Sequence, residues 1–168
     1  MNVLLVDAYN IIGAWPDLKK LKEQDFEAAR DRLIEYMAEY QAYTGFRVIV
    51  IFDAHMVPGA ETRERKRNVE VVYTREKETA DECIEKLVSQ IKDVQTTVYV
   101  ATSDYVEQWT VFSQGALRKS ARELYREMKE IENQIAQKIE EKYTPRKKAS
   151  VRFNEEIIML FEKWRRGK

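Results

Sequence analysis

Four aspartates are candidates for chemistry, and three of them follow short apolar runs. Asp7 ends the run VLLVD, Asp53 ends FRVIVIFD, and Asp104 follows VYVATS. Asp81 lies in the segment ETADE. Carboxylates that converge repel one another unless a cation joins them. We therefore expect a shared metal site built from Asp7, Asp53, Asp81 and Asp104.

The other available ligands indicate which metal this would be. The chain has one cysteine, Cys83, and one histidine, His55. A zinc site built from cysteines is therefore excluded, as is a ribonuclease that works with a pair of histidines. Oxygen ligands favour Mg²⁺ or Mn²⁺. Such an ion activates water and stabilises charge on a transferring phosphate, which is the chemistry of phosphodiester hydrolysis.

The apolar runs themselves predict the strands of a buried, mostly parallel sheet, at 3–6, 46–52, 69–73 and 98–101. Amphipathic patterns predict helices at 25–43, with a stop at Gly45, and at 79–91, opened by a Thr79–Glu82 capping box. Ligands of such α/β sheets bind at the carboxyl ends of the strands, where these aspartates lie.

Beyond Asp104 the pattern is weaker. One helical turn is expected at 105–108, a short strand at 110–112 and a long helix at 120–143, opened by Ser120 and Glu123. A basic connector, TPRKKAS, and an amphipathic helix at 154–164 follow. We expect one domain over residues 1–168, in which 144–168 form a basic C-terminal extension and helix.

Each aspartate also has a structural interpretation. Asp7 could close a turn, and Asp53 could support the site without forming part of it. Asp81 could complement a helix dipole, worth about 0.3–1 kcal/mol, and Asp104 could cap a helix, worth about 1 kcal/mol. A common site explains why all four aspartates lie at one edge of the sheet. The structural interpretation needs a separate reason for each aspartate.

Polar and aromatic neighbours extend the predicted site. Asn10 could orient a carboxylate or contact a phosphate, and Thr102 and Ser103 could donate hydrogen bonds near Asp104 or to a phosphate. Trp15 is expected to pack beneath the site and Cys83 to lie in the core. The side chains expected to contact RNA are Arg63, Arg65, Lys66 and Arg67 on a loop, Tyr105 by stacking, and Arg146, Lys147 and Lys148. The alternative for the basic residues is a solvated surface.

Composition restricts the location more than the activity. The 168 residues carry 29 basic and 29 acidic side chains, a net charge of zero, which suits an acidic pocket within a basic rim. The start of the chain lacks the features of a signal peptide, and no apolar run approaches the ~20 residues that span a bilayer. We expect a cytoplasmic protein with no membrane partner; the oligomeric state stays open.

The motifs LLVDAYNIIGAW, IFDAH, ETADE, VATSDYVEQ and GALRKSARELYRE occur in order. Together, over residues 2–127, they resemble the YacP-like branch of the NYN domain family, which is related to PIN nucleases. The resemblance implies a PIN-like three-layer α/β fold, a divalent metal, and catalytic roles for Asp7, Asn10, Asp81 and Asp104. It also implies an endoribonuclease associated with the ribosome that cuts mRNA during translation.

We therefore expect an endoribonuclease that cleaves single-stranded RNA. The alternative is a non-catalytic RNA- or ribosome-binding module, although carboxylates without a metal would repel RNA. An aspartyl-phosphate phosphatase normally has Asp-x-Asp at its first strand, whereas Asp7 is followed by Ala8, Tyr9 and Asn10. A DNA flap nuclease needs more carboxylates and a helical arch, for which the chain has little room.

Overall fold

A six-stranded sheet forms the centre of the described structure, in the order β3-β4-β2-β1-β5-β6. The computed structural model describes residues 1–53, 62–104, 109 and 114–155, with residues 62–65 and 142–155 described by their backbone alone. Neighbouring strands are parallel except at β3, which is antiparallel to β4. The strands are β1 (Asn2–Asp7), β2 (Arg47–Phe52), β3 (Thr62–Lys66), β4 (Val69–Tyr73), β5 (Thr97–Ala101) and β6 (Leu117–Lys119).

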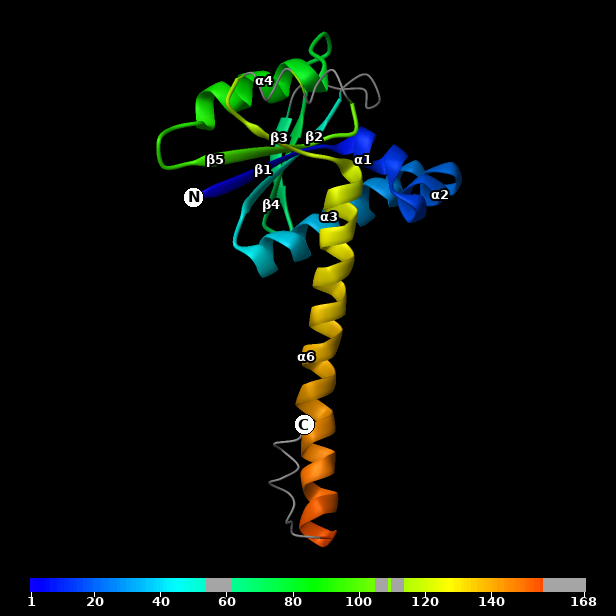
Figure 1. Cartoon of the computed structure of the whole chain (residues 1–168). Coiled ribbons are helices and arrows are strands. Elements are labelled where there is room, and N and C mark those ends of the chain that lie inside the picture. Colours follow the sequence, from blue (N-terminus) through cyan, green and yellow to red (C-terminus); the bar gives the residue numbers. More distant parts are fainter. Residues whose placement is uncertain (54–61, 105–108, 110–113, 156–168) are drawn as a thin grey trace. The chain divides into compact units, whose positions relative to one another are not determined.

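Helices cover both faces of this sheet, as Figure 1 shows. Helix α4 packs on β1, β2 and β5, while α1 and α3 pack on the opposite face. The predicted three-layer α/β architecture with a mostly parallel sheet is thus confirmed. The described helices are α1 (Ala8–Ala14), α2 (Pro16–Gln24), α3 (Phe26–Thr44), α4 (Ala80–Ile91) and α6 (Ala121–Glu155).

Two compact units divide the chain, Met1–Met128 and Lys129–Lys168. The first contains the sheet, the helices α1 to α4 and the first residues of α6. The second contains the rest of α6, which is helical as far as Glu155. Within the described residues, no helix combines the length and the apolar character that crossing a membrane requires.

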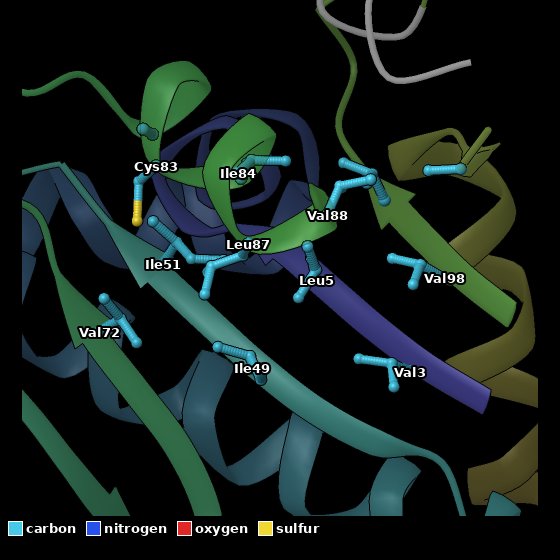
Figure 2. Close-up of a cluster of buried hydrophobic side chains, with 13 residues drawn as sticks. Val3, Leu5, Ile49, Ile51, Val72, Cys83, Ile84, Leu87, Val88 and Val98 are labelled. Atoms are coloured by element: carbon cyan, nitrogen blue, oxygen red, sulfur yellow. The ribbon is translucent and has the colours of Figure 1, made fainter. Parts of the chain in front are cut away.

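The apolar runs form strands that are buried on both faces of the sheet. Val3, Leu4, Leu5 and Val6 are all completely buried, because β1 lies in the middle of the sheet and is covered on both faces. On one face, side chains of β1 and β2 pack against one side of α4 (Figure 2). That side of α4 carries Cys83, Ile84, Leu87 and Val88, so the expected core position of Cys83 is confirmed.

The predicted helix ends are confirmed by their capping bonds. The Asp25 carboxylate accepts a hydrogen bond from the Ala28 amide, and Gly45 ends α3 with a φ of 80°. Thr79 and Glu82 form the reciprocal capping box of α4. Ser120 and Glu123 form the same pair of bonds at the start of α6.

Several elements differ from the sequence predictions. Residues 8–24, to which no element was assigned, form α1 and α2, and residues 117–119 form the edge strand β6. Helix α1 has no side-chain cap, which removes its sequence signal. The expected turn at 105–108 and strand at 110–112 lie outside the described residues.

The basic run between β2 and β4 is a second correction. Arg63, Arg65 and Lys66 belong to strand β3 and not to a loop. Arg67 and Asn68 form a two-residue turn with φ values of 52° and 70°, which joins β3 to β4 as a hairpin. The strand forms by pairing with the edge of β4, although its sequence is highly charged, and charged residues suit an exposed edge.

The C-terminal segment is a third correction. The expected basic connector at 144–150 is helical and belongs to α6, which continues past Pro145. The basic residues Arg146, Lys147 and Lys148 therefore lie on a helix. Most of the last predicted helix, residues 156–164, is outside the described part of the chain.

The hairpin turn provides a test of this part of the fold. Arginine is disfavoured at positive φ, whereas asparagine tolerates it, so Arg67→Asn should raise the free energy of unfolding by about 0.5–1 kcal/mol. The loss of the exposed Arg67–Glu35 ion pair should cost about 0.5 kcal/mol or less. Urea unfolding measures both, with Glu35→Gln as the control for the ion pair. A destabilised Arg67→Asn variant would contradict the assigned turn.

Candidate functional site

A pocket of about 440 Å³ lies where β1 and β2 end and α4 begins. This is the carboxyl edge of the parallel strands, at which the sequence placed the acidic site. The pocket brings together three of the four predicted aspartates and the predicted asparagine. Its lining residues are Asp7, Tyr9, Asn10, Asp53, Thr79, Ala80 and Asp81.

Asp7 is the most buried acid of the pocket. It is the last residue of β1 and is only 8% exposed. One of its carboxylate oxygens, Oδ2, accepts a hydrogen bond from the Thr102 hydroxyl at 3.3 Å. A carboxylate buried to this degree needs donors or a cation nearby, and Thr102 supplies one donor from the end of β5.

Thr102 connects Asp7 with Asp104. Its side chain is fully buried, and its hydroxyl oxygen accepts the backbone N–H of Asp104 at 3.0 Å. The backbone N–H of Thr102 donates to the carbonyl of Lys119 in β6, so this edge strand helps to hold the residue. Asp104 therefore lies close to the pocket through Thr102, but it is not one of the lining residues.

Asp53 has a structural role at the edge of the pocket, and its place in a metal site stays a prediction. It lines the pocket, and its Oδ2 accepts the backbone N–H of Ala80, the first residue of α4, at 3.3 Å. A negative charge at this position is favoured by the dipole of α4. Asp53 thus joins the end of β2 to the helix that carries Asp81.

Asp81 and its acidic neighbours have different surroundings. Asp81 lies half-buried in the first turn of α4 and faces the pocket. Glu82 instead accepts the backbone N–H of Thr79, and this hydrogen bond lowers the pKa of Glu82. Glu78 pairs with Lys86 at 2.8 Å. Of these acids, only Asp81 lines the pocket.

Asn10 is held in the pocket by Ser103, which follows β5. It lies in α1, and its side-chain oxygen Oδ1 accepts hydrogen bonds from both the backbone N–H and the hydroxyl of Ser103. Thr102 and Ser103 were expected to donate hydrogen bonds near Asp104. They are donors, but their acceptors are Asp7 and Asn10, residues more than ninety positions earlier in the chain.

Tyr9 forms an aromatic wall of the pocket. Its ring packs on Phe26 and Phe52, with 5.3 Å between ring centroids in both pairs. Burial raises the pKa of the Tyr9 phenol, and the nearby Arg30 guanidinium partly opposes this effect. The phenol is therefore neutral at physiological pH.

Trp15 has the packing role predicted for it. It is 1% exposed, and its indole N–H donates to the carbonyl of Ala121 at 2.8 Å. Its ring contacts Tyr36 and Tyr125. Trp15 thereby holds the junction of α1 and α2 against α3 and the first turn of α6.

The donor set decides which ion could bind. Within the described residues, no three acidic, histidine or cysteine side chains are grouped closely enough to form a metal site by themselves. Mg²⁺ commonly uses one or two protein carboxylates and completes its shell with water and substrate phosphate. The carboxylates of the pocket fit a partly hydrated Mg²⁺ or Mn²⁺ and do not fit an ion enclosed by protein.

Of the predicted RNA-contacting residues, only Lys66 and Arg67 have described side chains, and neither lines the pocket. Lys66 and Arg67 are exposed, and Arg67 pairs with Glu35 at 3.3 Å. The side chains of Arg63, Arg65, Arg146, Lys147 and Lys148 are not described, and Tyr105 and His55 lie outside the described residues. Their contact with RNA stays a prediction.

Known proteins match this chain over nearly its whole length. The family model for the YacP-like NYN domain matches residues 4–166. The uncharacterized protein YacP of Bacillus subtilis (strain 168) is 55% identical over 167 residues, which are 99% of this chain and 98% of that protein.

Two solved structures have the same fold. The crystal structure of Rae1 (YacP) from Bacillus subtilis has a TM-score of 0.77 at 55% identity, covering 99% of this chain and 96% of that one. Its W164L mutant has a TM-score of 0.74 at 57% identity, covering 83% and 81%. With a matching fold and a family match over almost every residue, this chain belongs to the YacP-like NYN domain family, a family of nucleases.

Proposed function

We propose that this protein is a metal-dependent endoribonuclease that cleaves single-stranded RNA, with mRNA on the translating ribosome as its substrate in the cytoplasm. The observation that carries the proposal is the pocket in which Asp7, Asp53 and Asp81 meet Asn10. The pocket lies at the carboxyl ends of parallel strands, where α/β proteins bind ligands. The chain belongs to a nuclease family, and this supports the proposed chemistry.

Asp7 and Asp81 are the proposed ligands of Mg²⁺ or Mn²⁺, with Asp53 and Asp104 as further acids beside them. When bound, the ion supplies activation of the attacking water and neutralisation of charge on the phosphate. The protein's own part is to hold these carboxylates apart from bulk water and in fixed directions. We expect 5′-phosphate and 3′-hydroxyl ends as products.

The hydrogen bonds of the pocket support this division of roles. Thr102 orients Asp7, and Asp53 fixes the start of α4 and hence the position of Asp81. The aromatic wall at Tyr9 excludes water from one side, which strengthens electrostatic interactions inside the pocket. Preorganised charges of this kind account for much of the rate enhancement in phosphoryl chemistry.

Contacts with RNA and the ribosome are proposed for the basic residues and Tyr105. Arg63, Arg65, Lys66 and Arg67 lie on or next to the edge strand β3, and Arg146, Lys147 and Lys148 on α6. Basic side chains of this kind bind phosphates without regard to sequence. In the competing proposal, a non-catalytic binding module, the acidic pocket would have no use and would oppose RNA binding.

Asp7→Asn and Asp81→Asn should each reduce RNA cleavage by on the order of 100-fold or more, because each removes a charge that the reaction needs. The measurement is primer extension on mRNA, naked and on translating ribosomes, in Mg²⁺ or Mn²⁺. Asp31→Asn makes the same change on the exposed side of α3 and should leave cleavage unchanged. If the wild type and all three variants leave the RNA uncut while the wild type still binds ribosomes, the endoribonuclease proposal fails and the non-catalytic binding module takes its place.

Thr102→Val should weaken both the fold and the activity. The variant keeps the shape of the side chain but leaves the Asp7 carboxylate and the Asp104 N–H without this partner. We expect the free energy of unfolding to fall by about 1–3 kcal/mol and cleavage to fall by about tenfold. Thr102→Ser keeps the hydroxyl and should retain most of both. Equal activity in wild type and Thr102→Val would show that this hydroxyl does not orient Asp7.

A further inference from the structure

The amide of Asn10 has a fixed direction in the pocket. We propose that Asn10 acts as a hydrogen-bond donor to a phosphate oxygen of the RNA, and not as a metal ligand, and that Ser103 is the residue that positions it. This inference rests on the proposed function, since it assigns a role within the same pocket.

The chemistry of Ser103 determines how the Asn10 amide is turned. A backbone N–H can only donate, so its partner on Asn10 must be the oxygen Oδ1. The Ser103 hydroxyl donates to the same oxygen. A flipped amide would place its NH₂ group against the Ser103 N–H, donor against donor, and lose that bond. The orientation therefore follows from the bonding partners.

Two consequences follow for the two ends of the amide. Both donors of Ser103 are directed at Oδ1, so a metal ion at this oxygen would have to compete with two hydrogen bonds. The nitrogen Nδ2 points away from Ser103 and carries two hydrogens. Within the described part of the chain it donates no hydrogen bond, although Asn10 lines the pocket.

The other lining side chains leave Asn10 as the donor that a phosphate can reach. The hydroxyl of Thr79 is engaged with Glu82 in the capping box of α4. The hydroxyl of Tyr9 is buried. The three aspartates repel a phosphate unless a cation intervenes. Among the described lining residues, the Asn10 amide alone offers an available side-chain N–H to an anionic oxygen.

Substitutions of Asn10 distinguish a role as a hydrogen-bond donor from a role as a metal ligand. Asn10→Asp keeps an oxygen for Ser103 but replaces the NH₂ group by a charged oxygen, and Asn10→Ala removes both. If Asn10 is a donor, both variants should bind single-stranded RNA about 10–100-fold more weakly, measured by fluorescence anisotropy in Ca²⁺, which neutralises the carboxylates and supports little hydrolysis. Binding of Mn²⁺ alone to Asn10→Ala, measured by calorimetry, should match wild type within about twofold.

The opposite results would overturn the proposal. A metal ligand predicts much weaker Mn²⁺ binding by Asn10→Ala, together with retained RNA cleavage by Asn10→Asp. RNA binding by Asn10→Asp at the wild-type level would also exclude the donor role. If wild-type protein cleaves no RNA, the proposed function fails, but the RNA-binding and Mn²⁺ measurements still decide the role of Asn10.

The role of Ser103 is tested through Asn10. Ser103→Ala removes the hydroxyl but keeps the N–H, so RNA binding should weaken only about two- to threefold, with Mn²⁺ binding unchanged. In the Asn10→Ala background, the same change should have no further effect on RNA binding, because the group it positions is absent. Additive effects in the double variant would show that Ser103 acts independently of Asn10.

Discussion

The buried carboxylate of Asp7 is the constraint on which the site depends. It ends the strand in the middle of the sheet, so its surroundings come from the neighbouring strands on both sides. Charge in such a place is costly without donors or a cation. The hydrogen bond from Thr102 offsets part of that cost, and Asp7 also faces the pocket, where a bound cation would stabilise its charge further. Two acids of this edge have structural partners: Asp7 has Thr102, and Asp53 has the first N–H of α4.

The site and the core are parts of one arrangement. Helix α4 carries Asp81 in its first turn, and its next turns pack on β1 and β2 through Cys83, Ile84 and Leu87. The apolar contacts that place the helix therefore also place the carboxylate. This explains why residues so far apart in the sequence are held in one pocket.

Sequence alone predicts the features that local physics determines. Buried parallel strands have a continuous apolar pattern, and capping residues mark where α4 and α6 begin. Strand β3 was missed because TRERK has no apolar signal and forms by pairing with β4. The contacts of Thr102 with Asp7 and of Ser103 with Asn10 could not be predicted. They depend on the register that aligns Val6 with Ala101, which is a property of the assembled sheet.

The central place of β1 also has a consequence for the order of folding. Its two neighbours, β2 and β5, are about forty and ninety residues further along the chain, and Trp15 binds the carbonyl of Ala121. The chain loses conformational entropy in closing these long loops before the strand contacts can stabilise it. We therefore expect folding to be slow and cooperative. A nascent chain that ends before β5 carries Asp7 but lacks Thr102 and Ser103. The pocket is therefore completed late in synthesis, together with the sheet itself.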